Sequence, residues 1–228
     1  MTLVKVKSSV KKILPPIALR LIKTFRPERM PLKGQEQPPE FYEQQVIEEQ
    51  RWHKHYTESG YYPLWTVIAD RIMLAQVNSI LEIACGTGQL ALLLHDKGLP
   101  NYRGFDFNRE AVKSAKEKHR ELICPEFDFV VADAFKTDLF HSHNYDAVLC
   151  TEFLEHVEGD LEVIEKIRSG THFYGTVPNY PAPAHVRVFN NTNEVAERYA
   201  KYFNSFRVDA HLCNLRGMTL YLLEGTKK

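Results

Sequence analysis

From residue 79 onward, short apolar segments rich in β-branched and aromatic residues alternate with longer segments of helical periodicity. The apolar segments span residues 80–84, 102–105, 127–131, 145–149 and 172–177, and the helical segments span residues 89–97, 109–122 and 154–168. Strands that alternate with helices of about 10 to 15 residues are typical of βαβ units, in which helices cover both faces of a parallel sheet. The alternation therefore predicts an α/β fold with a doubly wound, mostly parallel sheet.

The two ends of the chain add to this core. Residues 206–212 and 218–224 are strand-like and follow a last helix near residues 193–202. Only residues 213–217 separate the two segments, too few for a parallel crossover, so they predict a C-terminal antiparallel hairpin. Apolar residues at helical spacing predict helices over residues 40–58 and 64–77. We expect these helices to form a lid (residues 40–77) over a core of residues 78–228. The aromatic residues of the lid either cover an active site or pack the lid on the sheet. For Trp65, packing on the sheet is favoured.

Charge is distributed unevenly, although the formal net charge is zero. Residues 1–29 contain eight of the 29 Lys and Arg residues but only one of the 29 Asp and Glu residues, so they carry +7 and the remainder carries −7. One helical face in this segment is apolar, with Ile17, Leu21, Ile22 and Phe25. We expect residues 1–39 to be a basic amphipathic arm and linker. The arm either contacts an anionic membrane peripherally, docks on the acidic body or is disordered. Nucleic-acid binding is disfavoured because the core has no basic surplus.

Cysteine spacing and hydropathy indicate the compartment. The chain has four widely spaced cysteines and no Cys-x-x-Cys pair: Cys85, Cys124, Cys150 and Cys213. Reduced, buried thiols in a cytosolic protein fit this spacing better than disulfides or a zinc site. No uncharged apolar stretch approaches the roughly 18 residues of a membrane-spanning helix, and the apolar run of residues 13–19 contains two prolines. We expect a cytoplasmic protein, either free or peripheral to the inner face of a membrane.

The sharpest local motif joins the first predicted strand to the next helix. Its turn contains Gly86 and Gly88, which allow a tight turn and close approach of a ligand, and the free N–H groups at the helix start can bind a polar or anionic group. Asp106 ends the next strand, where a carboxylate can accept both hydroxyls of a ribose. Asp133 and Ala134 follow the third strand. Each aspartate alone fits a helix cap or a solvated turn, but their joint placement predicts an adenosine site.

Over residues 56–224 the chain resembles the class I S-adenosylmethionine-dependent methyltransferases. The resemblance rests on E-I-A-C-G-T-G-Q at residues 82–89, G-F-D-F-N at 104–108, A-D-A at 132–134, Y-D-A-V-L-C-T-E-F-L-E-H-V at 145–157 and T-V-P-N at 176–179. The E-F-L-E-H-V and V-P-N pieces are most similar to the branch of ubiquinone-type O-methyltransferases and small-molecule or sugar-related methyltransferases. Ser169-Gly170-Thr171 departs from the Pro-Gly-Gly turn that is common there.

The resemblance implies a Rossmann-like fold and S-adenosylmethionine as the cofactor. The residues that it implies for the cofactor are Glu82, Gly86, Thr87 and Gly88 at the methionine end, with Ala84 in the same turn, Asp106 at the ribose, Phe107, Asp133 and Ala134 around the adenine, and Thr151 and Glu152 beside the sulfonium. It also implies a small-molecule methyl acceptor.

Candidates for acceptor chemistry follow the fourth and fifth strands. Glu152, Glu155 and His156 stand at positions i, i+3 and i+4 and would share one face of a helix. Three interpretations remain open: local caps and hydrogen bonds, His156 as general base, and a divalent-metal site, which E-x-x-E-H resembles in some ubiquinone O-methyltransferases. His185, after the fifth strand, is either a second candidate base or a residue that orders its loop.

We therefore expect a methyltransferase acting on a small molecule, at an oxygen of a metabolite, glycan or lipid-linked intermediate. One alternative is an NAD-dependent oxidoreductase, because Gly86-x-Gly88-x-x-Ala91 also satisfies the dinucleotide pattern. The position of Glu82 inside the first strand, the C-terminal hairpin and the lack of a second substrate domain argue against it. The other alternative is a non-catalytic module that binds S-adenosylmethionine.

Overall fold

The computed structural model describes residues 34–120, 126–213 and 218–228, which lie in one compact unit, Lys33–Lys228. The predicted basic arm of residues 1–29 lies outside the described residues, as does Cys124. Cys85, Cys150 and Cys213 are free thiols, and the first two are buried. Within the described ranges, no helix is both long and apolar enough to span a bilayer.

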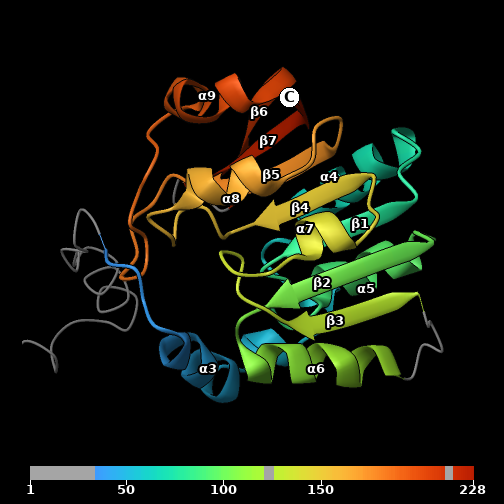
Figure 1. The fold of residues 1–228 in the computed structure, drawn as a ribbon. Helices are drawn as coiled ribbons and strands as arrows, with labels where there is room; N and C mark the ends of the chain where they lie inside the picture. Colours follow the sequence, from blue (N-terminus) through green and yellow to red (C-terminus); the bar gives the residue numbers. More distant parts are fainter. Residues whose placement is uncertain (1–33, 121–125, 214–217) are drawn as a thin grey trace, which may run out of the picture. The chain divides into compact units, whose positions relative to one another are not determined.

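Seven strands form one sheet in the order β3-β2-β1-β4-β5-β7-β6 (Figure 1). The strands are β1 (Ser79–Ile83), β2 (Asn101–Asp106), β3 (Phe127–Val131), β4 (Ala147–Thr151), β5 (His172–Pro178), β6 (Phe203–Leu212) and β7 (Thr219–Lys227). Neighbours among β1 to β5 pair in parallel, whereas β7 is antiparallel to both β5 and β6. The prediction of a Rossmann-like, mostly parallel sheet with a C-terminal antiparallel hairpin is confirmed.

Helices cover both faces of the sheet. In Figure 1, α7 (Leu139–Ser142) and α8 (Asp160–Lys166) lie in front, and α4 (Tyr62–Leu74) and α5 (Gln89–Asp96) lie behind. Strand side chains alternate between two apolar cores: along β4, Ala147 and Leu149 pack on one face and Val148 and Cys150 on the other. Since successive side chains of a strand point to opposite faces, a strand that is covered on both sides must be apolar throughout. The remaining helices are α6 (Arg109–Arg120), on the core that contains α4 and α5, and α9 (Thr192–Tyr199), on the core that contains α7 and α8.

The predicted helix over residues 40–58 is shorter in the structure. α3 (Pro39–Glu48) ends early, and two short 3₁₀ helices follow, Gln50–His53 and Tyr56–Glu58. The carbonyl of Trp52 accepts hydrogen bonds from Thr87 Oγ1 (2.6 Å) and Lys118 Nζ (2.9 Å), and the carbonyl of Lys54 accepts one from Gln89 Nε2 (2.7 Å). These side chains come from α6, from the start of α5 and from the turn before it. They satisfy carbonyls that would otherwise need hydrogen bonds from backbone N–H groups of an α-helix. Trp65 is buried in the core, as the packing interpretation expects.

The predicted helix over residues 154–168 also differs, and this error affects the site. α8 begins only at Asp160, and the residues before it form a turn in which His156 N donates to Phe153 O (2.9 Å). The Arg187 guanidinium donates to the carbonyls of Leu154, Val157 and Glu158. Because a distant arginine satisfies these carbonyls, the segment adopts a turn in place of a helix.

Candidate active site

The predicted site residues gather at the carboxyl edge of the parallel strands. The arrowheads of β2, β3 and β4 point toward this edge in Figure 1, and α3 lies on the same side. The strand order reverses between β1 and β4. In doubly wound sheets, ligands bind outside the carboxyl ends of the strands at such a switch point. The topology therefore selects the edge at which the glycine turn and Asp106 are found.

The turn between β1 and α5 is built from left-handed backbone conformations. Ala84, Gly86 and Gly88 have φ values of 55°, 54° and 73°. Glycine adopts this region without a Cβ penalty, whereas Ala84 is a strained exception of the kind that clusters at functional sites. A Cβ on Gly88 would also lie 3.0 Å from the Cβ of Ala115 on α6. The turn is thus held in a tight conformation, with its amides at the sheet edge.

Asp106 is fixed by backbone amides. Its Oδ2 accepts from Gly86 N (3.0 Å) and its Oδ1 accepts from Asn108 N (2.8 Å). Burial raises the pKa of the carboxyl to about 6, although hydrogen bonds from these amides lower it. At neutral pH the group is an oriented carboxylate with lone pairs left for further hydrogen bonds. This arrangement suits the two hydroxyls of a ribose.

Other predicted cofactor residues support the surrounding backbone. Buried Glu82 accepts a hydrogen bond from the Tyr102 hydroxyl, and burial raises its pKa to about 8. Asp133 pairs with Lys136 (2.8 Å) and accepts from Phe135 N (2.9 Å), and the adjacent Ala134 is buried. The hydroxyl of Thr87 is engaged by the Trp52 carbonyl, as described above. The polar groups of Glu82, Thr87 and Asp133 thus have partners within the protein.

Glu152 follows Thr151 at the end of β4. It has a φ of 52°, and its Oε1 accepts from Thr176 Oγ1 (2.9 Å) on β5. Burial raises the pKa of Glu152 to about 7, while hydrogen bonds from Thr176 and Tyr61 lower it. The residue implied beside the sulfonium is therefore oriented by the neighbouring strand and by a tyrosine that precedes α4.

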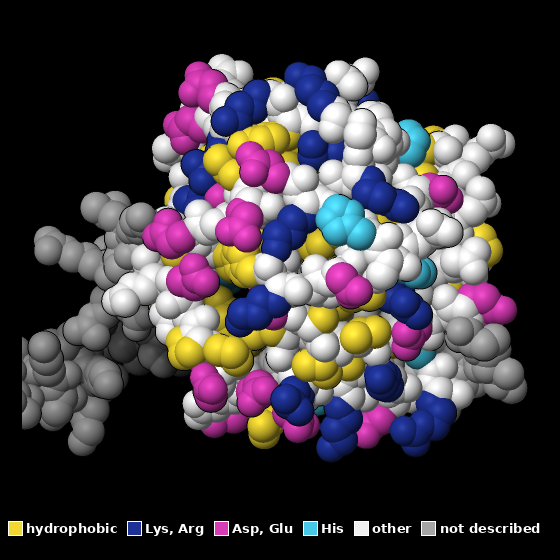
Figure 2. All heavy atoms as spheres, viewed as in Figure 1, with side chains coloured by type: hydrophobic (Ala, Val, Ile, Leu, Met, Phe, Trp, Pro, Cys, Tyr) yellow, Lys and Arg dark blue, Asp and Glu magenta, His cyan; other side chains and the backbone are white. Residues whose placement is uncertain are grey.

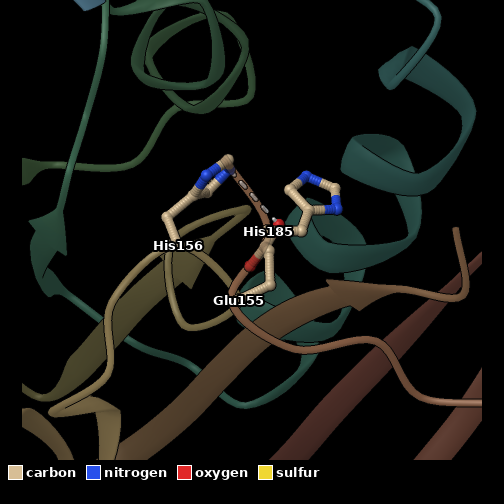
Figure 3. A group of neighbouring side chains, drawn as sticks. All are labelled: Glu155, His156 and His185. Atoms are coloured by element: carbon tan, nitrogen blue, oxygen red, sulfur yellow. Dashed lines mark ion pairs between the residues drawn. The ribbon is translucent and has the colours of Figure 1, made fainter. Parts of the chain in front are cut away.

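Both candidate bases lie next to Glu155 (Figure 3). One ligand atom from each of Glu155, His156 and His185 lies within 4.8 Å of the others, and His156 Nε2 is 3.7 Å from Glu155 Oε1. The side chain of Glu155 has 0% exposure, and among the described residues neither of its oxygens has a hydrogen-bond partner. Burial raises the pKa of Glu155 well above its usual range, and Glu152 adds to the shift.

Backbone carbonyls set the tautomer of both imidazoles. His156 Nδ1 is 3.1 Å from Ala184 O, and His185 Nδ1 is 2.9 Å from Tyr180 O. A carbonyl can only accept, so each Nδ1 carries the proton and each Nε2 keeps its lone pair. Burial lowers the pKa of both rings, that of His156 to about 4 with a contribution from His185. Two neutral imidazoles thus accompany a buried carboxyl group.

The predicted grouping of Glu152, Glu155 and His156 on one helical face is wrong, because no helix covers them. The structure brings together Glu155, His156 and His185, and it turns Glu152 toward Thr176. Sequence reasoning also missed Arg187, which binds the turn carbonyls and lies 3.2 Å from buried Asp160. Two signals were present in the sequence. An arginine stands between Val186 and Val188, and Gly159 followed by the acidic residue Asp160 marks the true start of the helix.

The sequence has relatives among methyltransferases. Residues 80–171 match the family model of a methyltransferase domain. The ubiquinone biosynthesis O-methyltransferase of Photobacterium profundum is 32% identical over 87 residues, which are 38% of this chain and 36% of that protein. The matched segment thus spans little more than a third of this curated relative.

Solved structures share the fold over most of the chain. The cyclase SpnF has a TM-score of 0.68 at 15% identity and covers 87% of this chain and 98% of its own. The N-methyltransferase NodS from Bradyrhizobium japonicum WM9, in complex with S-adenosyl-L-homocysteine, has a TM-score of 0.64 at 13% identity, with 82% and 97% covered. Magnesium protoporphyrin IX methyltransferase (ChlM) from Synechocystis PCC 6803, with bound S-adenosylmethionine, has a TM-score of 0.62 at 14% identity, with 83% and 97% covered.

At these identities the structural likeness concerns the fold. Together, the sheet topology, the glycine turn and the match over residues 80–171 support a class I S-adenosylmethionine-dependent methyltransferase fold and domain.

Proposed function

We propose that this protein transfers the methyl group of S-adenosylmethionine to an oxygen of a small-molecule acceptor, such as a metabolite, glycan or lipid-linked intermediate. The observation that carries the proposal is the convergence of the glycine turn, the Asp106 carboxylate and the Glu155–His156–His185 group at one sheet edge. The O-methyltransferase relative supports oxygen as the acceptor atom. The fold alone does not specify the reaction, since a cyclase has the same fold.

The cofactor side would bind and align the methyl donor. Asp106 would accept the ribose hydroxyls, and the glycine turn would hold the methionine end through its amides. Phe107, Asp133 and Ala134 would surround the adenine. Glu82, Ala84 and Thr87 would maintain the turn, and Thr151 and Glu152 would lie beside the sulfonium. Positive charge on sulfur disappears during an in-line displacement, so alignment and exclusion of water dominate. Alignment alone can supply roughly 7 to 11 kcal/mol of the activation barrier.

A divalent cation fits the residues of the acceptor side. Glu155 is a buried carboxyl group with no hydrogen-bond partner among the described residues, and His156 and His185 keep lone pairs on Nε2. Two imidazoles and one carboxylate are a common ligand set for zinc and iron. Glu155, His156 and His185 would hold the cation, and a bound cation would polarise the acceptor oxygen. Without a cation, His156 or His185 would serve as the general base, but a pKa of about 4 makes His156 a weak one.

Calorimetry tests the binding of the cofactor and of a cation separately. We expect S-adenosylhomocysteine to bind the full chain, and NAD to bind more weakly or not at all. The absence of S-adenosylhomocysteine binding at millimolar concentration would remove the basis of the proposal, and tighter binding of NAD would favour an oxidoreductase. Titration of chelator-treated protein with zinc tests the cation site, with His156→Gln expected to abolish zinc binding and leave S-adenosylhomocysteine affinity unchanged. Unsubstituted protein that binds no zinc or manganese would favour the general-base role.

A turnover assay separates an enzyme from a binding module. Methyl-labelled S-adenosylmethionine is incubated with a small-molecule extract, and label in the extract is measured. An enzyme transfers label, and Asp106→Ala loses the transfer together with cofactor binding. A binding module retains the cofactor and transfers no label.

Residues 1–29 are a separate proposal, based on sequence alone. Their excess of positive charge and apolar face support peripheral contact with an anionic membrane. Deletion of residues 1–29 should reduce sedimentation with phosphatidylserine vesicles and leave S-adenosylhomocysteine affinity unchanged. Vesicle binding that persists after the deletion would contradict it. On the described face shown in Figure 2, basic and acidic side chains are interspersed.

A further inference from the structure

The segment that precedes α3, residues 34–38, is attached to both chain segments that carry the histidines; we call it the strap. Gly34 N donates to His185 O (2.8 Å), and Gln35 N donates to Pro183 O (3.0 Å). Glu36 Oε2 accepts from Glu158 N (2.9 Å), in the turn that contains His156. These contacts fix the position at which α3 begins.

Tyr42, in the first turn of α3, touches both sides of the site. Its hydroxyl oxygen is 3.3 Å from His156 Nδ1, and the two rings are nearly perpendicular, with centroids 5.8 Å apart. The same ring packs edge-on against Phe107, with centroids 5.6 Å apart. Phe107 directly follows Asp106, the proposed ribose ligand. A single side chain therefore contacts an acceptor-side imidazole and the neighbour of a cofactor-side carboxylate.

The Tyr42 hydroxyl and a loop carbonyl share one proton of His156. The Nδ1–H donates to Ala184 O at 3.1 Å, and the phenol oxygen lies 3.3 Å from the same nitrogen. Both distances are longer than the usual 2.9–3.0 Å, as expected for a bifurcated bond. The imidazole is thus restrained by the loop after β5 and by α3. Burial and the nearby carboxylates of Glu155, Glu36 and Asp106 raise the pKa of Tyr42, so the phenol stays neutral.

We propose that Tyr42 is a positioning residue that couples the two sides of the site: its hydroxyl restrains the His156 ring, and its contact with Phe107 transmits the occupancy of the region of Asp106 and Phe107 to that restraint. The contact serves His156 equally as a general base or as a metal ligand. The inference rests on the proposed function only for the identity of the cofactor, since the Tyr42–His156 contact is present in the chain itself.

The test follows the His156 ring by NMR in full-length protein with ¹⁵N-labelled histidine, with the signal assigned by its loss in His156→Gln. In ligand-free protein, Tyr42→Phe keeps the ring contacts and removes the shared hydrogen bond. We expect it to move the His156 ring signal and to leave that of buried His119 in place. Addition of S-adenosylhomocysteine should move the His156 signal in unsubstituted protein, and Tyr42→Ala should abolish this response.

The affinity for S-adenosylhomocysteine gives a second readout. Tyr42→Ala removes the ring that supports Phe107 beside Asp106 and should weaken binding by up to about 12-fold, which corresponds to the full contribution of an aromatic pair. Tyr42→Phe should bind as tightly as unsubstituted protein. Tyr202→Ala is the matched control and should change neither readout, because Tyr202 lies in the 3₁₀ helix Ala200–Tyr202 and, among the described residues, makes no ring contact with His156 or Phe107.

Two results would overturn the inference. If the His156 signal is unchanged in ligand-free Tyr42→Phe, Tyr42 does not position the His156 ring through its hydroxyl. A His156 signal that still responds to S-adenosylhomocysteine in Tyr42→Ala, as it does in unsubstituted protein, removes the coupling. If no protein binds S-adenosylhomocysteine, the proposed function and the coupling both fail, while the ligand-free comparison still decides the contact between Tyr42 and His156.

Discussion

The cofactor side and the acceptor side of the site differ in how their charged groups are satisfied. Asp106, on the cofactor side, already accepts from the amides of Gly86 and Asn108. Glu155, on the acceptor side, is fully buried, and no described residue hydrogen-bonds to its carboxyl oxygens. Burying a carboxylate without partners is costly, so this group must carry a proton or face a bound cation. The carboxylate of the proposed cofactor side is thus hydrogen-bonded within the protein, whereas the described residues provide no hydrogen bond to that of the proposed acceptor side.

The two sides also differ in what holds them. The cofactor turn and Asp106 are close in the chain and follow adjacent strands, β1 and β2. The acceptor side joins the turn after β4 to the loop after β5, and buried ion pairs hold this junction. Asp160 accepts from Arg198 Nη2 (2.7 Å) and Tyr199 Oη (2.7 Å), and Arg187 lies 3.2 Å away. Because different contacts hold the two sides, a substitution on one side should leave the ligand binding of the other side unchanged.

Asp160→Asn should have the largest effect of the substitutions considered, and it should act on the free energy of unfolding. Removing one partner of a buried ion pair typically costs 3 to 5 kcal/mol, and because Arg198 is partly exposed we expect about 3 kcal/mol. Urea denaturation should show this loss in the free energy of unfolding. The affinity for S-adenosylhomocysteine, measured well below the midpoint, should stay within about twofold. Asp209→Asn, in a more exposed ion pair with Arg71, is the control and should cost under about 1 kcal/mol. A parallel loss of cofactor affinity would show that the two sides are not independent.

Asp106→Asn should give the next largest effect, now on the cofactor side. The amide keeps the shape of the carboxylate, but its NH₂ group would face the backbone N–H of either Gly86 or Asn108. Hydrogen bonds to a charged group contribute about 1.5 to 3 kcal/mol, so the affinity for S-adenosylhomocysteine should fall about 10- to 150-fold. Calorimetry measures this loss, and zinc binding at Glu155, His156 and His185 should be retained. Unchanged cofactor affinity would remove Asp106 from the site.

The same contrast explains which parts of the molecule the sequence could predict. The glycine turn and Asp106 depend on a strand, a turn and a helix that are contiguous in the chain, so local periodicity was sufficient. In the two predicted helices with the largest errors, over residues 40–58 and 154–168, distant side chains bind backbone carbonyls in the parts that are not α-helical. Lys118 binds the Trp52 carbonyl, and Arg187 binds the carbonyls of residues 154, 157 and 158. Local periodicity cannot report such long-range bonds. For this reason the sequence identified His156 as a candidate site residue but placed it on a helix, whereas it lies in a turn.

The pH dependence of cofactor binding should be smaller, about tenfold. Burial raises the pKa of Asp106 to about 6, and its ionised form is the better acceptor for ribose hydroxyls. Affinity is therefore full above this pKa and is lost as the pH falls through it. At pH 5 about one tenth of the group is ionised, so S-adenosylhomocysteine should bind about tenfold more weakly than at pH 8. Asp106→Asn should lack this dependence. If the variant keeps the same pH profile, another group is responsible.

Gly34→Ala should have the smallest effect, and it probes the strap that joins the acceptor side to α3. A Cβ at this position would lie 2.3 Å from Pro183 O and 2.4 Å from Ala182 O, so the strap must shift away from the loop. The bonds from Gly34 N and Gln35 N would then weaken, at a cost of about 1 kcal/mol because the released groups reach water. Hydrogen exchange should become faster at these two amides. Gly60→Ala is the matched control, with nothing within 4 Å of an added Cβ.

Since Gly34 is bonded to the carbonyl of His185, faster exchange with unchanged S-adenosylhomocysteine affinity would assign the strap to the acceptor side. Loss of affinity in Gly34→Ala alone would show that the strap also supports the cofactor side, and the contrast between the two sides would then hold only for their polar groups.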